Sequence, residues 1–503
     1  MNNLESFVIE PGKVCISNLK DIYFGKYENY VLCNETKRTM QQSVDNVKKL
    51  LSNENVKSVY GVNTGFGKLA STRIELQDLT TLQHNLIKSH CTGVGEFFDD
   101  SFVRLITILK VASLARGYSG IRFEVLNSLL TLINKEYYPC IPVKGSVGAS
   151  GDLAPLAHLV APLIGIGTVR KNGKIISAIQ ALDECKLDKL EMQPLEGLSL
   201  LNGTQVSTAI ALVSLFKLQT VMSACLEASA FSLIAIEGST QPFDKRIHEL
   251  RGHHGQMQVA EKMRNLLVEG IGNDYLNKSG RIQDPYSFRC LPQVLGACIE
   301  QISSIEKTLE IEANAVTNNP ISLFETNEFL SGGNFHAEPV AIAADILAII
   351  STEIASLSER RISILLDSNL SGLPPFLVNN SGLNSGFMIA QVTAAALVSE
   401  NKSKSFPCSV DSIPTSANQE DHVSMATHAA YRLLEMTENT AYVVAIEFLA
   451  ALQACDLRKI KGFSGKLLHV YKKLRAKIEF YENDRFFSDD IKIAKEFIFE
   501  NYR

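Results

Sequence analysis

One short stretch, Gly148-Ala149-Ser150-Gly151-Asp152, places a serine between the two smallest residue types and sets a carboxylate beside them. Glycine permits backbone angles that other residues avoid, and the methyl group of Ala149 leaves its carbonyl carbon open to approach. The amide nitrogen of Gly151 can therefore close a five-membered ring around Ser150. Loss of water from the ring, and of the Ser150 hydroxyl, would leave a methylidene group conjugated to a carbonyl, which is a strong electrophile. We expect Asp152 to assist the proton transfers of this closure.

Two other interpretations of Ser150 stay open at this point. A serine flanked by glycine is typical of a tight turn, and it also occurs as the nucleophile of hydrolases with a GxSxG motif. The second interpretation is weakened because Asp152 stands where that motif requires glycine. A hydrolase would predict covalent labelling of Ser150 by acylating or phosphonylating reagents.

Motifs for bound phosphates, dinucleotides and metals are incomplete. The spacing from Gly61 to Gly67-Lys68 is one residue too long for a phosphate-binding loop, and Gly165-Ile166-Gly167 lacks the third glycine of a dinucleotide fingerprint. His253 and His254 are adjacent, without the spacing that places two histidines on one helix face. We therefore predict no metal and no external cofactor.

Several separated segments, in this order along the chain, resemble those of the aromatic amino acid ammonia-lyases. Besides Ala149-Ser150-Gly151, they are Tyr60-Gly-Val-Asn-Thr-Gly-Phe-Gly67, Leu200-Leu-Asn202-Gly-Thr-Gln205, Gln283-Asp-Pro-Tyr286-Ser-Phe-Arg289, Ser331-Gly-Gly-Asn-Phe335-His-Ala-Glu338 and Ser416-Ala-Asn-Gln-Glu-Asp421. The resemblance covers essentially the whole chain. It implies that Ala149-Ser150-Gly151 forms a methylidene-imidazolone group by autocatalytic cyclisation. One departure is Asn318, where the family usually has aspartate before Asn-Pro.

The resemblance also implies a role for each matching residue in the removal of ammonia from an α-amino acid. A positioned acid or base contributes about 10²–10⁴-fold to a rate, which corresponds to roughly 3–5 kcal/mol. Whole enzymes lower the barrier by about 8–23 kcal/mol, so a covalent electrophile is needed as well. Tyr60 would take the β-proton, provided that its pKa is lowered from its usual value near ~10. The remaining residues would bind the substrate. Arg289 would bind the substrate carboxylate with two parallel hydrogen bonds, aided by Tyr286 and Asn202. Gln283 would lie near the carboxylate or the prosthetic group, and Phe335 would pack against the substrate.

The choice of substrate is predicted from Ser89-His90 and from Gln419-Glu420. The histidine-specific members of the family resemble this chain at His90, whereas other members have Phe-Leu or His-Leu at this position. His90 and Glu420 can bond the two nitrogens of an imidazole, and a buried carboxylate is a poor neighbour for a bare phenyl ring. We expect L-histidine as substrate and urocanate as product, in histidine degradation. A tyrosine or phenylalanine ammonia-lyase, or an aminomutase, is the alternative.

Each of these residues also has a structural interpretation. His90, Tyr60 and Phe335 are also typical of a protein core, and Arg289 and Glu420 of a structural ion pair. If all of them were structural, the chain would be an inactive helical scaffold, a protein of another class.

The elements that must position these residues are mainly helical. Three segments, 204–236, 339–366 and 423–452, are long and nearly apolar all round, so they predict helices buried against one another in a large central bundle. Shorter helical periodicities appear at residues 79–86, 102–109 and 467–478. We expect a smaller mixed N-terminal region, residues 1–200, to carry the Tyr60 and Ser150 loops, and residues 201–503 to form the bundle and a helical C-terminal region. Glycine-rich breaks near 145–151 and 197–203 predict loops.

Composition and charge argue against nucleic-acid and membrane partners and indicate a cellular compartment. The 49 basic and 54 acidic residues give a net charge of −5 without any basic run, which argues against nucleic acid. The 10 cysteines form no CxxC pair, so we expect a reduced, cytoplasmic protein. The charge-free runs 197–216 and 368–399 contain too many polar and glycine residues for a lipid-facing helix, so we expect them to be buried in a protein without a membrane partner. The family resemblance implies a homotetramer with shared active sites.

Overall fold

The computed structural model describes residues 6–52, 58–272 and 274–502, which form two compact units. The first unit consists of Met1–Val213, Glu306–Asp345 and Pro407–Tyr431, and the second of Ser214–Ile305, Ile346–Phe406 and Arg432–Arg503. Segments that are far apart in the sequence thus build each unit. The predicted regions 1–200 and 201–503 stay a prediction.

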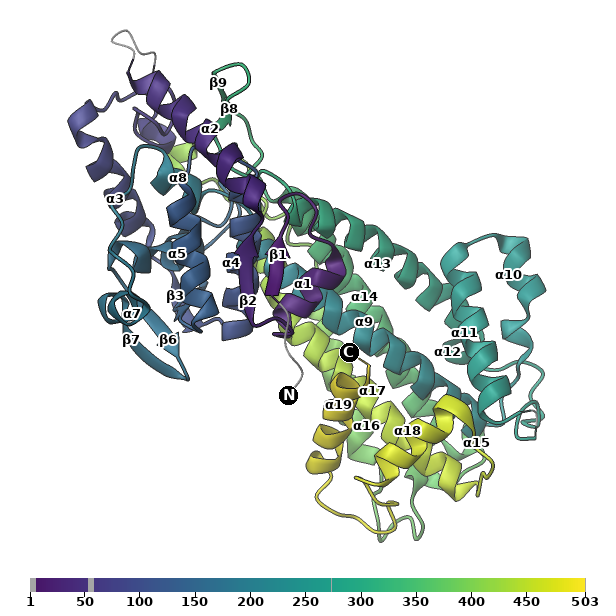
Figure 1. Cartoon of the computed structure of the whole chain (residues 1–503). Coiled ribbons are helices and arrows are strands. Elements are labelled where there is room, and N and C mark those ends of the chain that lie inside the picture. Colours follow the sequence, from purple (N-terminus) through teal and green to yellow (C-terminus); the bar gives the residue numbers. More distant parts are fainter. Residues whose placement is uncertain (1–5, 53–57, 273, 503) are drawn as a thin grey trace. The chain divides into compact units, whose positions relative to one another are not determined.

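The first unit combines helices with short strands, as expected for the mixed N-terminal region (Figure 1). Its helices are α1 (Ile16–Tyr23), α2 (Asn34–Leu51), α3 (Leu79–His90), α4 (Asp100–Leu114), α5 (Phe123–Asn134), α6 (Leu153–Val160), α7 (Ala178–Cys185) and α8 (Glu196–Leu201). Its strands are β1 (Ser6–Ile9), β2 (Asn29–Leu32), β3 (Val94–Phe97), β4 (Tyr138–Pro139), β5 (Pro142–Lys144), β6 (Thr168–Lys171), β7 (Lys174–Ser177), β8 (Ile321–Leu323) and β9 (Glu328–Leu330).

The strands make four small sheets, and the described residues contain no larger one. β1 and β2 pair in parallel, with Ser6 opposite Asn29, whereas β3 pairs with β5 and β8 with β9 in antiparallel fashion. The third sheet has the order β4-β6-β7 and is antiparallel throughout. The strands are short, and the helices α4, α5, α6 and α8 supply many of the buried apolar side chains of this unit.

All the named secondary-structure elements among the described residues of the second unit are helices. Its helices are α10 (Lys245–Arg251), α11 (His254–Gly270), α12 (Tyr286–Arg289), α15 (Ser368–Ser371), α16 (Met388–Lys404), α18 (Gly465–Arg475) and α19 (Ser488–Asn501). Four long helices contribute residues to both units: α9 (Gln205–Ala235), α13 (Leu291–Ala313), α14 (Glu338–Leu366) and α17 (Ala426–Leu457). The three predicted long helices correspond to α9, α14 and α17, so the mainly helical fold class is confirmed.

A buried ion pair joins the long helices in the core of the second unit. Arg361 on α14 and Glu447 on α17 are both fully buried, and Nε of Arg361 lies 2.5 Å from Oε1 of Glu447. Nη2 donates to the other carboxylate oxygen at 2.7 Å, and Ser232 on α9 donates to Oε1 at 2.9 Å. These hydrogen bonds satisfy a charged pair that would otherwise be costly to bury.

The long helices are apolar because they are interior helices. By length and composition α9, α14 and α17 could each cross a membrane, but 83%, 67% and 83% of their most apolar windows are buried inside the protein. Apolar side chains on all faces are expected where each face meets another helix.

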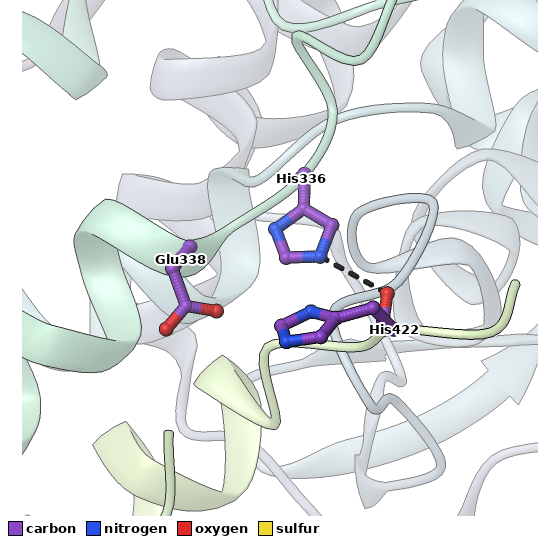
Figure 2. A group of neighbouring side chains, drawn as sticks. All are labelled: His336, Glu338 and His422. Carbon is purple, nitrogen blue, oxygen red and sulfur yellow. Dashed lines mark hydrogen bonds between the residues drawn. The ribbon is translucent and has the colours of Figure 1, made fainter. Parts of the chain in front are cut away.

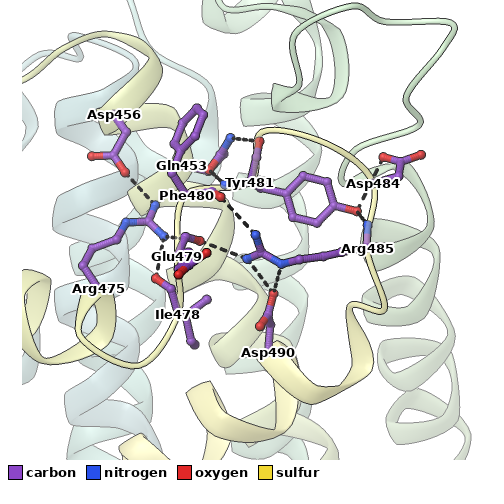
Figure 3. Close-up of polar contacts among 10 residues, drawn as sticks. All are labelled: Gln453, Asp456, Arg475, Ile478, Glu479, Phe480, Tyr481, Asp484, Arg485 and Asp490. Carbon is purple, nitrogen blue, oxygen red and sulfur yellow. Dashed lines mark hydrogen bonds and ion pairs between the residues drawn. The ribbon is translucent and has the colours of Figure 1, made fainter.

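Polar contacts fasten the C-terminal segment of the second unit (Figure 3). Gln453 on α17 donates to the carbonyl oxygen of Tyr481 at 2.8 Å and accepts from its amide at 2.9 Å. Arg485 pairs with Asp490 at 2.8 Å and also donates to two backbone carbonyl groups. The long connection between α18 and α19 is therefore held against the helices without regular structure of its own.

Two sequence-based expectations about burial and loops were wrong in part. The run 197–216 is buried as predicted, but 368–399 is not: Leu383 is 84% exposed and Ile389 is 62% exposed. This run consists of α15, short turns and most of α16, and it alternates buried with exposed residues. The predicted loop at 197–203 is helical as far as Leu201, because α8 continues through Gly197.

Candidate active site

The Ser150 loop is built on a very close approach of two backbone segments. Gly151 has φ +76° and forms a bridge to Gly203, and the amide of Asp152 donates to the Gly203 carbonyl at 2.7 Å. A Cβ atom on Gly151 would lie 2.2 Å from that carbonyl oxygen. Glycine is thus required at Gly151 both by the backbone angle and by the available space.

The Asp152 carboxylate holds this loop to the N-terminus of α9. Its Oδ2 accepts hydrogen bonds from the amides of Val206 and Ser207 at 3.0 and 2.8 Å and from the Ser207 hydroxyl at 2.9 Å. Its Oδ1 accepts from the hydroxyls of Ser146 and Thr427 at 3.0 and 2.7 Å. A buried carboxylate at a helix N-terminus is stabilised by the free amides and the helix dipole. These contacts position the loop, and the predicted role of Asp152 in proton transfer stays a prediction.

Asn202 and Lys110 support the loop from the other side. The side-chain amide of Asn202 donates to the carbonyl oxygen of Ser150 at 2.9 Å, and Nζ of Lys110 donates to the carbonyl oxygen of Asn202 at 2.6 Å. Lys110 is fully buried, and burial lowers its pKa to about 7 although the charge of Asp152 opposes this shift. Among the described residues, Oδ1 of Asn202 is buried without a hydrogen-bond partner.

Glu420 approaches Ser150 directly. Its Oε1 accepts a hydrogen bond from the Ser150 hydroxyl at 2.6 Å, and its Oε2 accepts one from Thr415 at 2.5 Å. Burial raises the pKa of Glu420, but the hydrogen bonds from Ser150, Thr415 and Ser416, with the nearby His90, together hold this pKa below its usual value. The serine hydroxyl therefore donates to a carboxylate rather than to a histidine base, which argues against the hydrolase interpretation.

The turn before Glu420 is strained. Ser416, Ala417 and Asn418 have φ values of 50°, 52° and 65°, in the left-handed region. Such angles cost roughly 1–2 kcal/mol for a residue with a side chain. Strain of this kind persists where the surroundings enforce it and is common at binding sites. Here it brings Glu420 back to pair with Thr415 through backbone hydrogen bonds.

His90 ends α3 and has a defined orientation. Its Nδ1 lies 2.8 Å from the carbonyl oxygen of Leu86. Since a carbonyl oxygen only accepts, Nδ1 carries the hydrogen, and the neutral ring keeps a free lone pair on Nε2. Burial lowers the pKa of His90 against the opposing effects of Leu86 and Glu420. The ring is therefore suited to accept a hydrogen bond through Nε2.

Tyr60 lies in the glycine-rich loop, and its phenol oxygen accepts a hydrogen bond from the amide of Gly67 at 3.2 Å. Burial raises the pKa of Tyr60, and the hydrogen bond from Gly67 only partly opposes this effect. The lowered pKa that a base at this position needs is thus absent here. An additional positive charge or donor near the phenol would be required to supply it.

A cavity of about 920 Å³ in the first unit brings most of the predicted residues together. Eight of them line it: Tyr60, His90, Ala149, Ser150, Asn202, Phe335, Gln419 and Glu420. Apolar side chains of Leu82, Leu86 and Leu198 form part of the wall. The cavity thus combines an apolar surface with a few polar groups, which is typical of a small-molecule site.

Gln283, Tyr286 and Arg289 do not line this cavity, and they belong to the second unit. Tyr286 is 69% exposed, and the guanidinium carbon of Arg289 lies 4.6 Å from the centre of its ring. Among the described residues, Nε of Arg289 is buried without a hydrogen-bond partner. The roles predicted for these three residues stay predictions.

Asn318 fits its surroundings as an amide. Its Oδ1 accepts from the Ser119 hydroxyl at 3.1 Å, and its Nδ2 donates to the carbonyl oxygen of Pro320 at 3.0 Å. A carboxylate could not make the second contact. The departure from the family pattern is therefore satisfied locally.

Sequence analysis did not identify Lys110 or Thr415. A single lysine inside the apolar run Leu105–Leu114 was a usable signal, because a buried lysine needs a partner. No pattern marked Thr415, since its contact with Glu420 depends on the left-handed turn between them.

Comparison with known proteins agrees with this geometry. The family model for aromatic amino acid lyases matches residues 14–476. The histidine ammonia-lyase of Idiomarina loihiensis is 50% identical over 497 residues, which cover 98% of this chain and 96% of that protein. The crystal structure of histidine ammonia-lyase from Trypanosoma cruzi superposes with a TM-score of 0.90 at 36% identity, covering 98% of this chain and 93% of the other. The phenylalanine aminomutase of Pantoea agglomerans gives a TM-score of 0.92 at 30% identity, covering 98% and 99%. The chain belongs to the aromatic amino acid lyase family.

Proposed function

We propose that this protein eliminates ammonia from L-histidine to give trans-urocanate, the first step of histidine degradation. The observation that carries the proposal is the placement of His90 and Glu420 in the cavity of Ser150. Nε2 of His90 is one hydrogen-bond acceptor and the carboxylate of Glu420 is a second. A protonated imidazole has two N–H donors, so it can donate one hydrogen bond to each of these acceptors. Phenylalanine offers no donor on its ring, and tyrosine offers only one, the phenol O–H, where a protonated imidazole offers two.

We propose that Ala149-Ser150-Gly151 forms the methylidene-imidazolone group. The backbone supports this fit, because Gly151 lies where a Cβ atom has no room, Asn202 holds the carbonyl oxygen of Ser150, and Asp152 anchors the chain directly after Gly151. Asn202 lines the cavity, and its buried Oδ1 is an acceptor without a donor among the described residues. When formed, the group supplies an electrophile that makes the amino group a better leaving group.

The residues of the chain bind and orient the substrate and move its proton. His90 and Glu420 hold the imidazole, and Phe335 and the leucines pack against its faces and exclude water. Tyr60 is the candidate base for the β-proton. Since its pKa is raised in the free protein, binding of the substrate or of a partner subunit must bring a positive charge near its phenol before it can act.

We infer that Gln283, Tyr286 and Arg289 bind the substrate carboxylate in a homotetramer in which a neighbouring subunit completes the cavity. The exposed ring of Tyr286 and the unpartnered Nε of Arg289 support a role outside their own unit. A bidentate guanidinium would bind a carboxylate strongly. We further propose that the protein is cytoplasmic, in agreement with its free cysteines.

Ultraviolet absorbance of the conjugated product tests the substrate. Purified protein is incubated separately with L-histidine, L-tyrosine and L-phenylalanine, and the absorbance of urocanate or of the corresponding aryl acrylate is followed. We expect turnover of histidine alone. Turnover of tyrosine or phenylalanine would indicate the alternative specificity, a β-amino acid product would indicate an aminomutase, and an inert protein of full encoded mass would indicate a scaffold.

A further inference from the structure

Three side chains with metal-binding atoms meet at one edge of the cavity. His336, Glu338 and His422 each offer a ligand atom, and these atoms lie within 4.8 Å of one another (Figure 2). His336 and His422 also line the cavity that contains Ser150. We propose that these three residues bind a divalent transition metal ion of the zinc class.

His336 is held in the tautomer that a metal ligand requires. Its Nε2 lies 3.2 Å from the carbonyl oxygen of His422. Because this oxygen can only accept, Nε2 carries the hydrogen and Nδ1 of the neutral ring has the free lone pair. Figure 2 shows Nδ1 on the side of the ring that faces Glu338. Histidine ligands of metals are oriented in this way, by a hydrogen bond from the other ring nitrogen.

Glu338 provides a carboxylate oxygen to which no other described residue donates a hydrogen bond. It is the first residue of α14, and its Oε2 is buried without a hydrogen-bond partner among the described residues. An unpaired buried carboxylate oxygen costs free energy, and a cation beside it removes this cost. The unpartnered oxygen thus independently indicates a missing positive partner.

His422 leaves the site open to solvent. Its side chain is exposed, and Figure 2 shows its ring next to that of His336, with one ring nitrogen on the side of His336. A metal ion can therefore enter without rearrangement of the core. With three protein ligands, a fourth position would remain for water or a small molecule.

The set of ligands selects the metal. Two imidazole nitrogens and one carboxylate oxygen suit Zn²⁺ or Co²⁺, whereas Ca²⁺ and Mg²⁺ prefer oxygen ligands. Ligand atoms about 2.1 Å from a tetrahedral metal are about 3.4 Å apart. The present separations of up to 4.8 Å must therefore shorten, which rotation of the exposed His422 side chain permits.

Metal binding at this site would act on the neighbouring segment. His422 follows Glu420 by two residues, and His336 follows Phe335 directly. A metal ion would tie both segments to the start of α14 and restrict the position of the Glu420 carboxylate. We expect the metal to lower the KM for substrate more than it changes kcat. The metal site itself does not depend on the proposed substrate, since binding of the ion is measured directly.

Titration of chelator-treated, untagged protein with Co²⁺ tests the proposal. We expect one Co²⁺ per chain, with the intense visible absorption of tetrahedral nitrogen and oxygen coordination and without a thiolate charge-transfer band. H422Q and E338Q should each weaken binding at least ~10–100-fold. H428Q, which removes an exposed histidine of α17 outside the group, should bind as the unmodified protein does.

The same experiment can overturn the proposal. Absence of stoichiometric Co²⁺ binding to the unmodified protein would do so, as would equal binding by an H336Q/H422Q variant whose circular dichroism shows an intact fold. If that variant does not fold, X-ray absorption of the Co²⁺-loaded unmodified protein decides, because the proposal requires two imidazole ligands. Loss of substrate turnover with retained Co²⁺ binding would count against the proposed function and support the metal site.

Discussion

The two segments that meet at Ser150 are built in different ways. The loop of residues 145–152 is held by buried contacts, with the fully buried Asp152 accepting five hydrogen bonds and Gly151 packed against Gly203. The segment 413–425 is largely exposed, and it reaches Ser150 through the half-buried Glu420 after three left-handed residues. One segment is fixed by the core, whereas the other is mostly exposed and is held by a few hydrogen bonds.

This difference separates two tasks. A backbone that must cyclise needs its reacting atoms held close together before the reaction, so that no entropy is lost when the ring closes. Buried hydrogen bonds provide this positioning. A carboxylate that binds substrate must be able to exchange a serine partner for a ligand, which a solvent-facing turn permits. Changes in the first segment should therefore impair formation of the prosthetic group or the stability of the fold, and changes in the second should affect substrate binding alone.

The largest effect is expected from G151A. The new methyl group would lie 2.2 Å from the Gly203 carbonyl oxygen, so the two backbone segments must separate and ring closure should fail. Activity should fall by more than the ~10²–10⁴-fold that one acid or base contributes. Intact-mass spectrometry should find no loss of water.

G173A is the matched control for this variant. Gly173 has nearly the same φ, +75°, but a Cβ there would meet no atom within 4 Å. It should cyclise and retain activity. Equal loss of activity in both variants would mean that backbone strain in general, and not the contact with Gly203, explains the result.

The next effect concerns E420Q. Removal of the charge should lower kcat/KM for histidine by about 10²–10³-fold, because an imidazole bound in the cavity loses its charged partner. The mass should still show the loss of two waters, since the Ser150 loop is unchanged. D411N, which removes an exposed charge two residues before this segment, should behave as the unmodified protein. Full mass in E420Q would contradict the separation of tasks.

D152N should mainly reduce stability. The substitution replaces one carboxylate oxygen by an NH₂ group, which would then face N–H and O–H donors that it cannot accept from. The expected loss is about 2–4 kcal/mol in the free energy of unfolding. E420Q should change this free energy by less than about 1 kcal/mol. Urea unfolding of both variants measures the difference. Similar stabilities would remove the distinction between a fixed and an adaptable segment.

The smallest effect is a pH dependence caused by Lys110. Its pKa of about 7 in the folded protein lies below the ordinary lysine value of about 10.4, so the unfolded chain binds more protons between these pH values. The stability of the unmodified protein relative to K110M should therefore rise with pH in this window, by up to about 1.4 kcal/mol per pH unit, and level off below about pH 7. Urea midpoints of both proteins at pH 7, 8 and 9 measure this. A constant difference would show that Lys110 stays charged in the folded state.

Much of the fold and of the cavity was predictable from the sequence. The apolar runs predicted α9, α14 and α17 to within a few residues, because interior helices must be apolar on every face. The separated motifs predicted that Tyr60, His90, Ser150, Asn202 and Glu420 would meet, and they do.

Other features depend on tertiary contacts that no local pattern encodes. The raised pKa of Tyr60 arises from burial, and the contact of Lys110 with Asn202 from the packing of α4 against the turn after α8. The exposure of Leu383 could not be predicted either, since an apolar run does not reveal which side meets a core. The metal-binding group escaped notice because His336 and His422 are far apart in the sequence.

Intact-mass spectrometry of the unmodified protein and of S150A, combined with an assay of urocanate formation, tests the central claim most directly. The account predicts that the unmodified protein is two waters lighter than its encoded chain and converts L-histidine to urocanate. S150A should keep the second water and form no urocanate. An unmodified protein that forms urocanate at its full encoded mass would contradict the account.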